Sequence, residues 1–225
     1  MTTVPPTISP SLPPPGGFFV GSQVDLDNWP AKLRRYRLGL GLYVAAMVML
    51  FVAFSSAYIV RRGVPSFETA TGTYSLNWEP LRLPLGLLSI NTLLLAGASA
   101  SAEFARRKGY AWEHGSREET ISTSRWIGVA LLLTLGFVLG QGIAWRSLEQ
   151  RGLVLSSGAR TAFFYVLTGT HAIHAIVGMV ILAWIAFRYS RWLPSRRLIA
   201  VDLTAWYLHS MTVLWVYLFV FLMVA

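Results

Sequence analysis

The 225-residue chain carries 19 lysines and arginines against 10 aspartates and glutamates, a formal net charge of +9 at pH 7. Charged residues make up 13% of the chain and hydrophobic residues 54%, whereas a soluble domain contains roughly 25% charged residues, so the composition indicates an integral membrane protein. The basic residues flank long apolar blocks, unlike a nucleic-acid-binding surface, and the lack of cysteine excludes disulfides, iron–sulfur clusters and cysteine-ligated metal sites.

Residues 1–37 are expected to form a proline-rich N-terminal arm and a basic segment that precedes the membrane. Seven of the eleven prolines lie in the first 30 residues, and proline lacks the amide donor that a helix needs. The basic segment contains Lys32, Arg34, Arg35 and Arg37. We expect no secretory signal peptide, because no apolar stretch followed by a small-residue cleavage site is present here.

Residues 38–225 are expected to form one transmembrane domain, because five uncharged stretches follow one another. These predicted spans cover residues 38–60, 83–102, 126–145, 161–187 and 203–225. Twenty residues of helix reach about 30 Å, the thickness of the hydrocarbon core of a bilayer. Each span must be helical, because lipid offers no hydrogen bonds to open backbone groups. The predicted fold class is an all-α, polytopic membrane protein with five transmembrane helices.

The distribution of basic residues predicts the orientation of these spans. The N-terminal flank and the connections after the second and fourth spans carry 13 lysines and arginines, and the other connections carry 6. Since basic residues concentrate on the cytoplasmic side, we expect a cytoplasmic N-terminus and a C-terminus on the opposite side. Tryptophans near the span ends are expected to anchor the helices at the interface. They are Trp29, Trp78, Trp112, Trp192 and Trp206.

The predicted spans contain no aspartate, glutamate, lysine or arginine. Ionisable residues inside a membrane usually mark a proton relay, an ion path or a catalytic site, and these spans lack them. The chain also contains no phosphate-binding loop, HExxH motif or recognisable serine–histidine–acid arrangement. We therefore predict no catalytic residues and no metal site in this chain.

Three histidines, His171, His174 and His209, lie within the predicted spans. A b-type haem would need two histidines that face each other, but His174 lies about 20 Å and His209 about 9 Å from the cytoplasmic end of its span. A zinc or copper site would have too few ligands. The residues favour a structural role, in which the histidines form hydrogen bonds across helix interfaces. We interpret Asn91 and Gln141 in the same way.

Residues 164–178, FYVLTGTHAIHAIVG, resemble the signature helix of subunit III of the haem-copper oxidases, the cytochrome c oxidase subunit III family. The motif residues are Thr168, Gly169, His171, His174 and Gly178. Matching residues in the other spans are Asn91, Gln141, His209 and Trp215. The resemblance covers about residues 36–225 and fits the short, five-span bacterial form, which lacks the two N-terminal helices of the seven-span form.

The resemblance implies a non-catalytic subunit of a proton-translocating terminal oxidase, which reduces oxygen to water in a bacterial inner membrane. The C-terminus would then lie in the periplasm. Haem and copper would belong to partner subunits, and this chain would hold no metal. The implied partners are oxidase subunit I as the main contact, subunit II, a small subunit IV and structural phospholipids. Cytochrome c would be reached indirectly through the complex, and no nucleic acid would be bound.

The sequence departs from the family pattern at two expected carboxylates. Met47 stands where the first shared helix usually has a glutamate, and Thr212 stands where the last helix often has an aspartate. We therefore expect no direct proton-handling role for this chain. We also predict that His171 and His174 are neutral and have hydroxyl, amide or backbone partners.

Arg188 follows the fourth predicted span. The resemblance suggests that it contacts a lipid phosphate, which an arginine fork suits. Anchoring of the span by a positive charge on the cytoplasmic side explains the same residue equally well.

Other functions stay open from the sequence alone. Within the family, the chain could serve a quinol oxidase or a nitric oxide reductase complex. Outside the family, an independent small-solute transporter and a haem-bearing membrane anchor are the alternatives.

Overall fold

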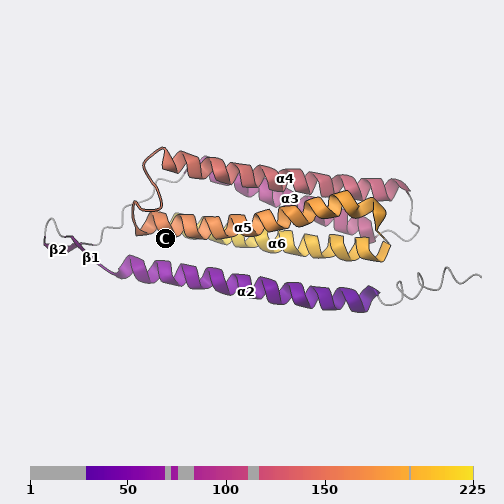
Figure 1. Cartoon of the computed structure of the whole chain (residues 1–225), viewed down its shortest axis with the longest axis horizontal. Helices are drawn as coiled ribbons and strands as arrows, with labels where there is room; N and C mark the ends of the chain where they lie inside the picture. The colour runs from indigo at the N-terminus through magenta and orange to yellow at the C-terminus, as the bar shows by residue number, and fades with distance from the viewer. Residues whose placement is uncertain (1–28, 69–71, 76–83, 111–116, 193, 225) are drawn as a thin grey trace, which may run out of the picture.

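The computed structural model describes residues 29–68, 72–75, 84–110, 117–192 and 194–224. Five long helices lie side by side in this part of the chain (Figure 1). They are α2 (Trp29–Gly63), α3 (Leu85–Tyr110), α4 (Arg117–Glu149), α5 (Ala159–Arg188) and α6 (Pro194–Val224). Each is long and apolar enough to cross a membrane. The predicted all-α class and the five spans are confirmed, whereas the proline-rich residues 1–28, Trp78 and Trp112 lie outside the described residues.

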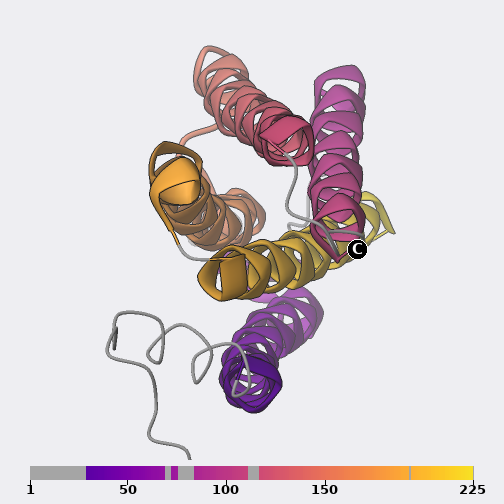
Figure 2. The same ribbon diagram turned by 90° about the vertical axis from the view of Figure 1, so that its right-hand side faces the viewer.

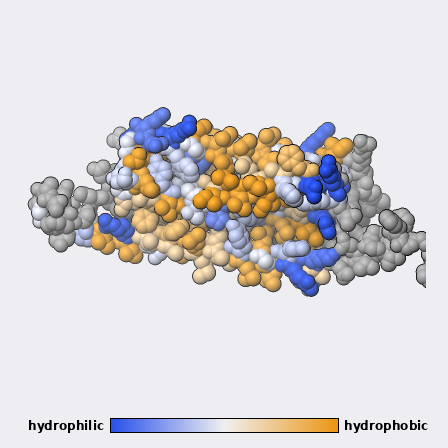
Figure 3. Space-filling view, viewed as in Figure 1, coloured by the Kyte–Doolittle hydropathy of each residue, from blue (hydrophilic) through white to orange (hydrophobic). Residues whose placement is uncertain are grey.

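The helices are longer than the apolar stretches that predict them. α2 begins at Trp29 and therefore includes the basic segment that precedes residue 38. Likewise, α3 continues to Tyr110 and α6 starts at Pro194. Hydropathy detects only the apolar part of a helix, but backbone hydrogen bonding continues into the polar region beyond it. Figure 3 shows the result, a broad hydrophobic band with hydrophilic clusters near both ends of the molecule.

The connection between α2 and α3 contains a small hairpin that the sequence analysis did not predict. Strand β1 (Ser66–Glu68) pairs antiparallel with β2 (Thr73–Ser75). Gly72 precedes β2 with φ of 65°, a conformation that glycine adopts without steric cost. Strands of three residues are too short to give a recognisable alternating pattern.

Successive helices run in opposite directions. The starts of α2, α4 and α6 and the ends of α3 and α5 therefore lie at one end of the molecule (Figure 1). We call this the basic end, because these segments contain the larger group of lysines and arginines. The hairpin, the α4–α5 connection and the C-terminus lie at the other end. The 3-10 helix η1 (Tyr189–Arg191) follows α5 at the basic end. Its first residue, Tyr189, is buried, and this burial raises the pKa of the Tyr189 phenol.

Helix α6 is at the centre of the packing, in contact with α2, α3 and α5. α2 lies against α6 and α5 on the side opposite α3 and α4 (Figure 2). It is the least buried of the five, with 17% of its most apolar window buried against 33–39% for the others. Most of the apolar surface of α2 is therefore left uncovered by the other described helices.

Candidate functional site

Helix α5 carries the motif residues and buries one face against its neighbours. Residues three or four apart form this face, which is the spacing that a helix brings into line. The buried residues include Phe164, Leu167, Thr168, His171, Ala172, Ala175 and Gly178. The histidine motif is therefore part of a helix–helix interface within the chain.

His171 is completely buried between α4, α5 and α6. Its Nε2 lies 3.1 Å from the backbone carbonyl oxygen of Met211, to which it donates. The ring of Phe137 lies 5.6 Å away and that of Trp215 5.1 Å, centroid to centroid. Among the described residues, Nδ1 of His171 has no hydrogen-bond partner. The site gives the imidazole one backbone partner and an aromatic cage.

His174 lies one turn further along α5 and is half-buried. Its Nδ1 lies 2.8 Å from the carbonyl oxygen of Thr170. The hydroxyl of Tyr207 donates to the carbonyl oxygen of His174 at 2.7 Å. As expected, backbone carbonyls are the partners of both motif histidines; their charge stays a prediction.

The other motif residues on α5 differ in how closely they pack. Gly178 faces the ring of Tyr207 so closely that an added Cβ would overlap it. Thr168 donates to the carbonyl oxygen of Phe164 at 2.7 Å and accepts a hydrogen bond from the indole of Trp145 at 3.1 Å. Gly169 differs from Gly178, because a Cβ there would meet nothing within 4 Å.

Asn91 and Gln141 are brought together, as an interhelical role requires. Their side-chain amides face each other across α3 and α4, with Nδ2 of Asn91 3.5 Å from Oε1 of Gln141. Trp215 on α6 donates its indole hydrogen to the hydroxyl of Thr92 at 3.0 Å. Oδ1 of Asn91 and Nε2 of Gln141 have no hydrogen-bond partner among the described residues.

His209 belongs to a different contact from the two motif histidines. Its Nδ1 makes a short hydrogen bond with the hydroxyl of Ser99, and its Nε2 lies 3.4 Å from Oε2 of Glu103. Both partners are on α3. His209 therefore contacts α3, whereas His171 contacts the backbone of α6.

An ion-pair cluster at the basic end was missed by the sequence analysis. Asp202 on α6 is completely buried, and Arg37 of α2 donates to both of its oxygens, at 2.8 and 2.7 Å. The hydroxyl of Tyr110 donates to the same carboxylate at 2.9 Å. Arg106 lies 3.6 Å from it. Three helices, α2, α3 and α6, therefore meet at one buried carboxylate.

Glu103 extends this cluster along α3. It accepts two hydrogen bonds from Arg106, at 2.7 and 2.8 Å, and one from Arg107 at 2.8 Å. Glu103 directly follows the second predicted span, which ends at residue 102. Asp202 directly precedes the fifth predicted span, which begins at residue 203. That position, with arginines three and four residues after Glu103, is the signal that could have revealed the cluster.

The two positions that lack an expected carboxylate are filled in different ways. Met47 is buried and packs in an apolar cluster with Phe51 and Met211. Thr212 is partly buried and donates to the carbonyl oxygen of Leu208 at 2.8 Å. Met47 therefore has apolar neighbours and the Thr212 hydroxyl has a backbone partner, so the surroundings of neither residue favour an ionised side chain.

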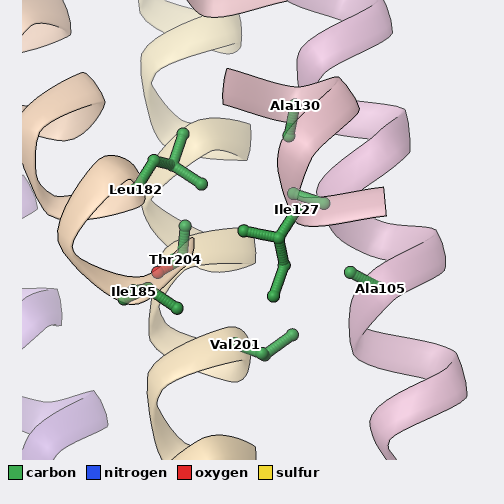
Figure 4. A pocket seen from close by; sticks show the side chains of 8 residues that line it. Ala105, Ile127, Ala130, Leu182, Ile185, Val201 and Thr204 are labelled. Carbon is green, nitrogen blue, oxygen red and sulfur yellow. The ribbon is translucent and has the colours of Figure 1, made fainter. Parts of the chain in front are cut away.

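A small apolar pocket lies between α3, α4, α5 and α6 (Figure 4). Its volume is about 10 Å³, close to the minimum that holds a single water molecule. The lining residues are Ala102, Ala105, Ile127, Ala130, Leu182, Ile185, Val201 and Thr204. This space is a packing gap, far below the size of a substrate site.

Arg188 is exposed at the basic end of α5. Its guanidinium lies 5.3 Å from the ring centroid of Trp184, which is also exposed. A cation held over an aromatic ring at the edge of an apolar surface is suited to an interfacial position. The geometry is compatible with both expectations for Arg188, a phosphate contact and a simple anchor.

These features define a class of protein, a polytopic membrane protein whose motif residues are used in helix packing. The described residues contain no group of three or more histidine, aspartate or glutamate side chains that could hold a metal ion. A family model described as cytochrome c oxidase subunit III matches residues 28–224. The chain belongs to this family.

Similar proteins come from bacteria and from eukaryotes. A probable cytochrome c oxidase subunit 3 of Nocardia farcinica is 28% identical over 189 residues, covering 81% of this chain and 84% of that protein. Cytochrome c oxidase subunit 3 of Pylaiella littoralis is 28% identical over 81% of this chain and 64% of its own length. The Bos taurus subunit 3 is 28% identical over 85% of this chain and 70% of its own length. The chain is thus closer in length to the Nocardia relative than to the other two.

Proposed function

We propose that the chain is a non-catalytic subunit III of a proton-translocating cytochrome c oxidase in a bacterial inner membrane. Its role is to stabilise subunit I, which would hold haem and copper together with subunit II. The observation that carries the proposal is the family match across all five helices. The burial of three motif residues of α5, Thr168, His171 and Gly178, inside the bundle supports a structural role over a catalytic one.

Purification of the complex from native membranes tests this assignment. The affinity-tagged chain, extracted in a mild detergent, should co-purify with a haem-copper subunit. The purified sample should show a Soret band and should consume oxygen when reduced cytochrome c is added. The chain expressed without the other subunits should show no Soret band and no oxygen uptake. A Soret band from the isolated chain, or its purification without any haem-copper subunit, would contradict the proposal.

The supporting role has its own kinetic test. Oxidase prepared from a strain that lacks this chain should begin turnover at a rate similar to that of the full complex and then lose activity within fewer turnovers. The measurement is oxygen uptake against time at saturating reduced cytochrome c. An unchanged number of turnovers before inactivation would remove the stabilising role but leave membership of the complex intact.

We also propose that Arg188 holds the phosphate of a structural lipid. Its exposed guanidinium at the end of an apolar helix, stacked on Trp184, supports this contact. Native mass spectrometry of the complex should show less retained phospholipid in Arg188→Ala than in Arg191→Ala, the replacement of another exposed arginine at the same end. Equal retention in the two variants would leave Arg188 as a charge anchor.

A further inference from the structure

Three buried polar atoms in the interior of the bundle have no hydrogen-bond partner in the part of the chain that the structure describes. They are Oδ1 of Asn91 on α3, Nε2 of Gln141 on α4 and Nδ1 of His171 on α5. Each of these residues is at most 1% exposed. A buried polar atom without a partner is costly, above all inside a membrane, because lipid offers no hydrogen bonds. These three atoms therefore call for a partner.

The contacts between α4 and α5 place Gln141 and His171 at nearly the same level of the bundle. The ring of Phe137 on α4 lies 5.6 Å from that of His171, centroid to centroid. Two turns further along α4, the indole of Trp145 donates to the hydroxyl of Thr168 at 3.1 Å. Gln141 lies one turn after Phe137 and one turn before Trp145. It is therefore between the levels of His171 and Thr168 on α5.

Asn91 reaches the same level from α3. Its Nδ2 lies 3.5 Å from Oε1 of Gln141, so the two side-chain amides already face each other. One apolar cluster has members about one turn away from the three polar residues on the same helices, namely Leu88, Leu95, Phe137, Ala144 and Ala175. The polar atoms are therefore enclosed in an apolar core. Two of these neighbours are alanines, which leave more room beside the polar atoms than larger side chains would.

The hydrogen-bonding capacities of the three atoms match those of a single water molecule. Oδ1 of Asn91 accepts and the Nε2 amide group of Gln141 donates. Since Nε2 of His171 donates to the carbonyl oxygen of Met211, Nδ1 of the neutral ring is an acceptor. Water offers two hydrogens and also accepts. A cation could not use the amide donor and an anion could not use the two acceptors, so an uncharged ligand fits best.

We propose that one water molecule is bound at this level. It donates to Oδ1 of Asn91 and to Nδ1 of His171, and it accepts from Nε2 of Gln141. This water joins α3, α4 and α5, and it gives a common role to three residues that the sequence analysis singles out on separate spans. The proposal rests on packing within the bundle and not on assembly with an oxidase.

A density map of the purified complex tests the site directly. Electron cryo-microscopy of the complex that contains the unaltered chain should show a separate peak about 2.7–3.2 Å from each of the three atoms. The comparison uses a map that resolves enclosed waters elsewhere in the complex. Direct pairing of the Asn91 and Gln141 amides, with no peak between them and His171, would overturn the proposal.

Paired replacements in the full-length chain give a second test, which needs no complex. Gln141→Met and His171→Leu each replace one partner of the water by an apolar side chain of similar size. Each should lower the apparent unfolding temperature in detergent. The two together should lower it by clearly less than the sum, because the second replacement removes an atom that has already lost its water.

His174→Leu is the matched control. His174 is on the same helix, but the partner of its Nδ1 is the carbonyl oxygen of Thr170. Its effect should therefore add to that of Gln141→Met. Additive effects with both histidines, or equal coupling with both, would contradict a water shared by Gln141 and His171. The density map stays decisive where a variant fails to fold.

Discussion

The close approach of α3 and α4 depends on Gly140, which lies against the buried side chain of Asn91. In Gly140→Ala the added methyl group would overlap the Asn91 amide, which is already in contact with Gln141. We expect destabilisation of about 1–3 kcal/mol, the usual cost of an overfilled core. The apparent unfolding temperature, followed by size-exclusion chromatography of heated detergent samples, should fall clearly.

Gly142→Ala is the matched control for this prediction. It is on the same helix, two residues later, and its Cβ would meet nothing within 4 Å. Since alanine favours a helix over glycine, this variant should be as stable as the unaltered protein or slightly more stable. Equal unfolding temperatures for the two variants would show that Asn91 moves aside without cost.

The two motif glycines of α5 should respond differently to the same replacement. Gly178→Ala would push the ring of Tyr207 away and weaken its hydrogen bond to the carbonyl oxygen of His174. We expect a loss of about 1–3 kcal/mol. Gly169→Ala has open space in this chain and should leave its stability unchanged. The same thermal assay measures both, and a large loss in Gly169→Ala alone would refute this account.

At the scale of elements, the attachment of α2 depends on the carboxylate of Asp202. α2 buries few residues, and Asp202 accepts both hydrogen bonds that tie Arg37 to α6. Asp202→Asn would leave Arg37 without its carboxylate, whereas Arg106 would keep its two hydrogen bonds to Glu103. Removal of a buried partner costs several kcal/mol, but Arg37 is 43% exposed, so we expect about 1–3 kcal/mol.

This loss should be localised, and hydrogen exchange can show where it falls. In Asp202→Asn, the backbone amides of the first half of α2 should exchange faster, while those of α4 should keep their rates. Arg107→Gln is the control within the same cluster. The side chain of Arg107 is 73% exposed and forms its ion pair with Glu103 on the protein surface. It should change exchange little. Uniformly faster exchange in all helices of Asp202→Asn would argue against a local clamp.

The five spans could be predicted from the sequence because apolar length is a local pattern. Apolar length identifies a membrane helix, and the seven-residue spacing of His171 and Gly178 places both on one face. The Arg37–Asp202 pair could not be predicted in this way, because its partners are 165 residues apart and meet only through tertiary packing. For the same reason the sequence offered no partner for His209.

At the scale of the whole molecule, the structure brings the basic ends of the helices to one end, and the positive-inside rule predicts that this end is cytoplasmic. Because the chain contains no cysteine, single cysteines can report this orientation without background labelling. Ser156→Cys lies in the α4–α5 connection and Arg191→Cys after α5, at opposite ends, and both positions are exposed. In intact spheroplasts, a membrane-impermeant maleimide should label Ser156→Cys and leave Arg191→Cys unlabelled. Lysis should make Arg191→Cys reactive. The reverse pattern would place the N-terminus outside and show that another subunit, not the basic end, sets the orientation.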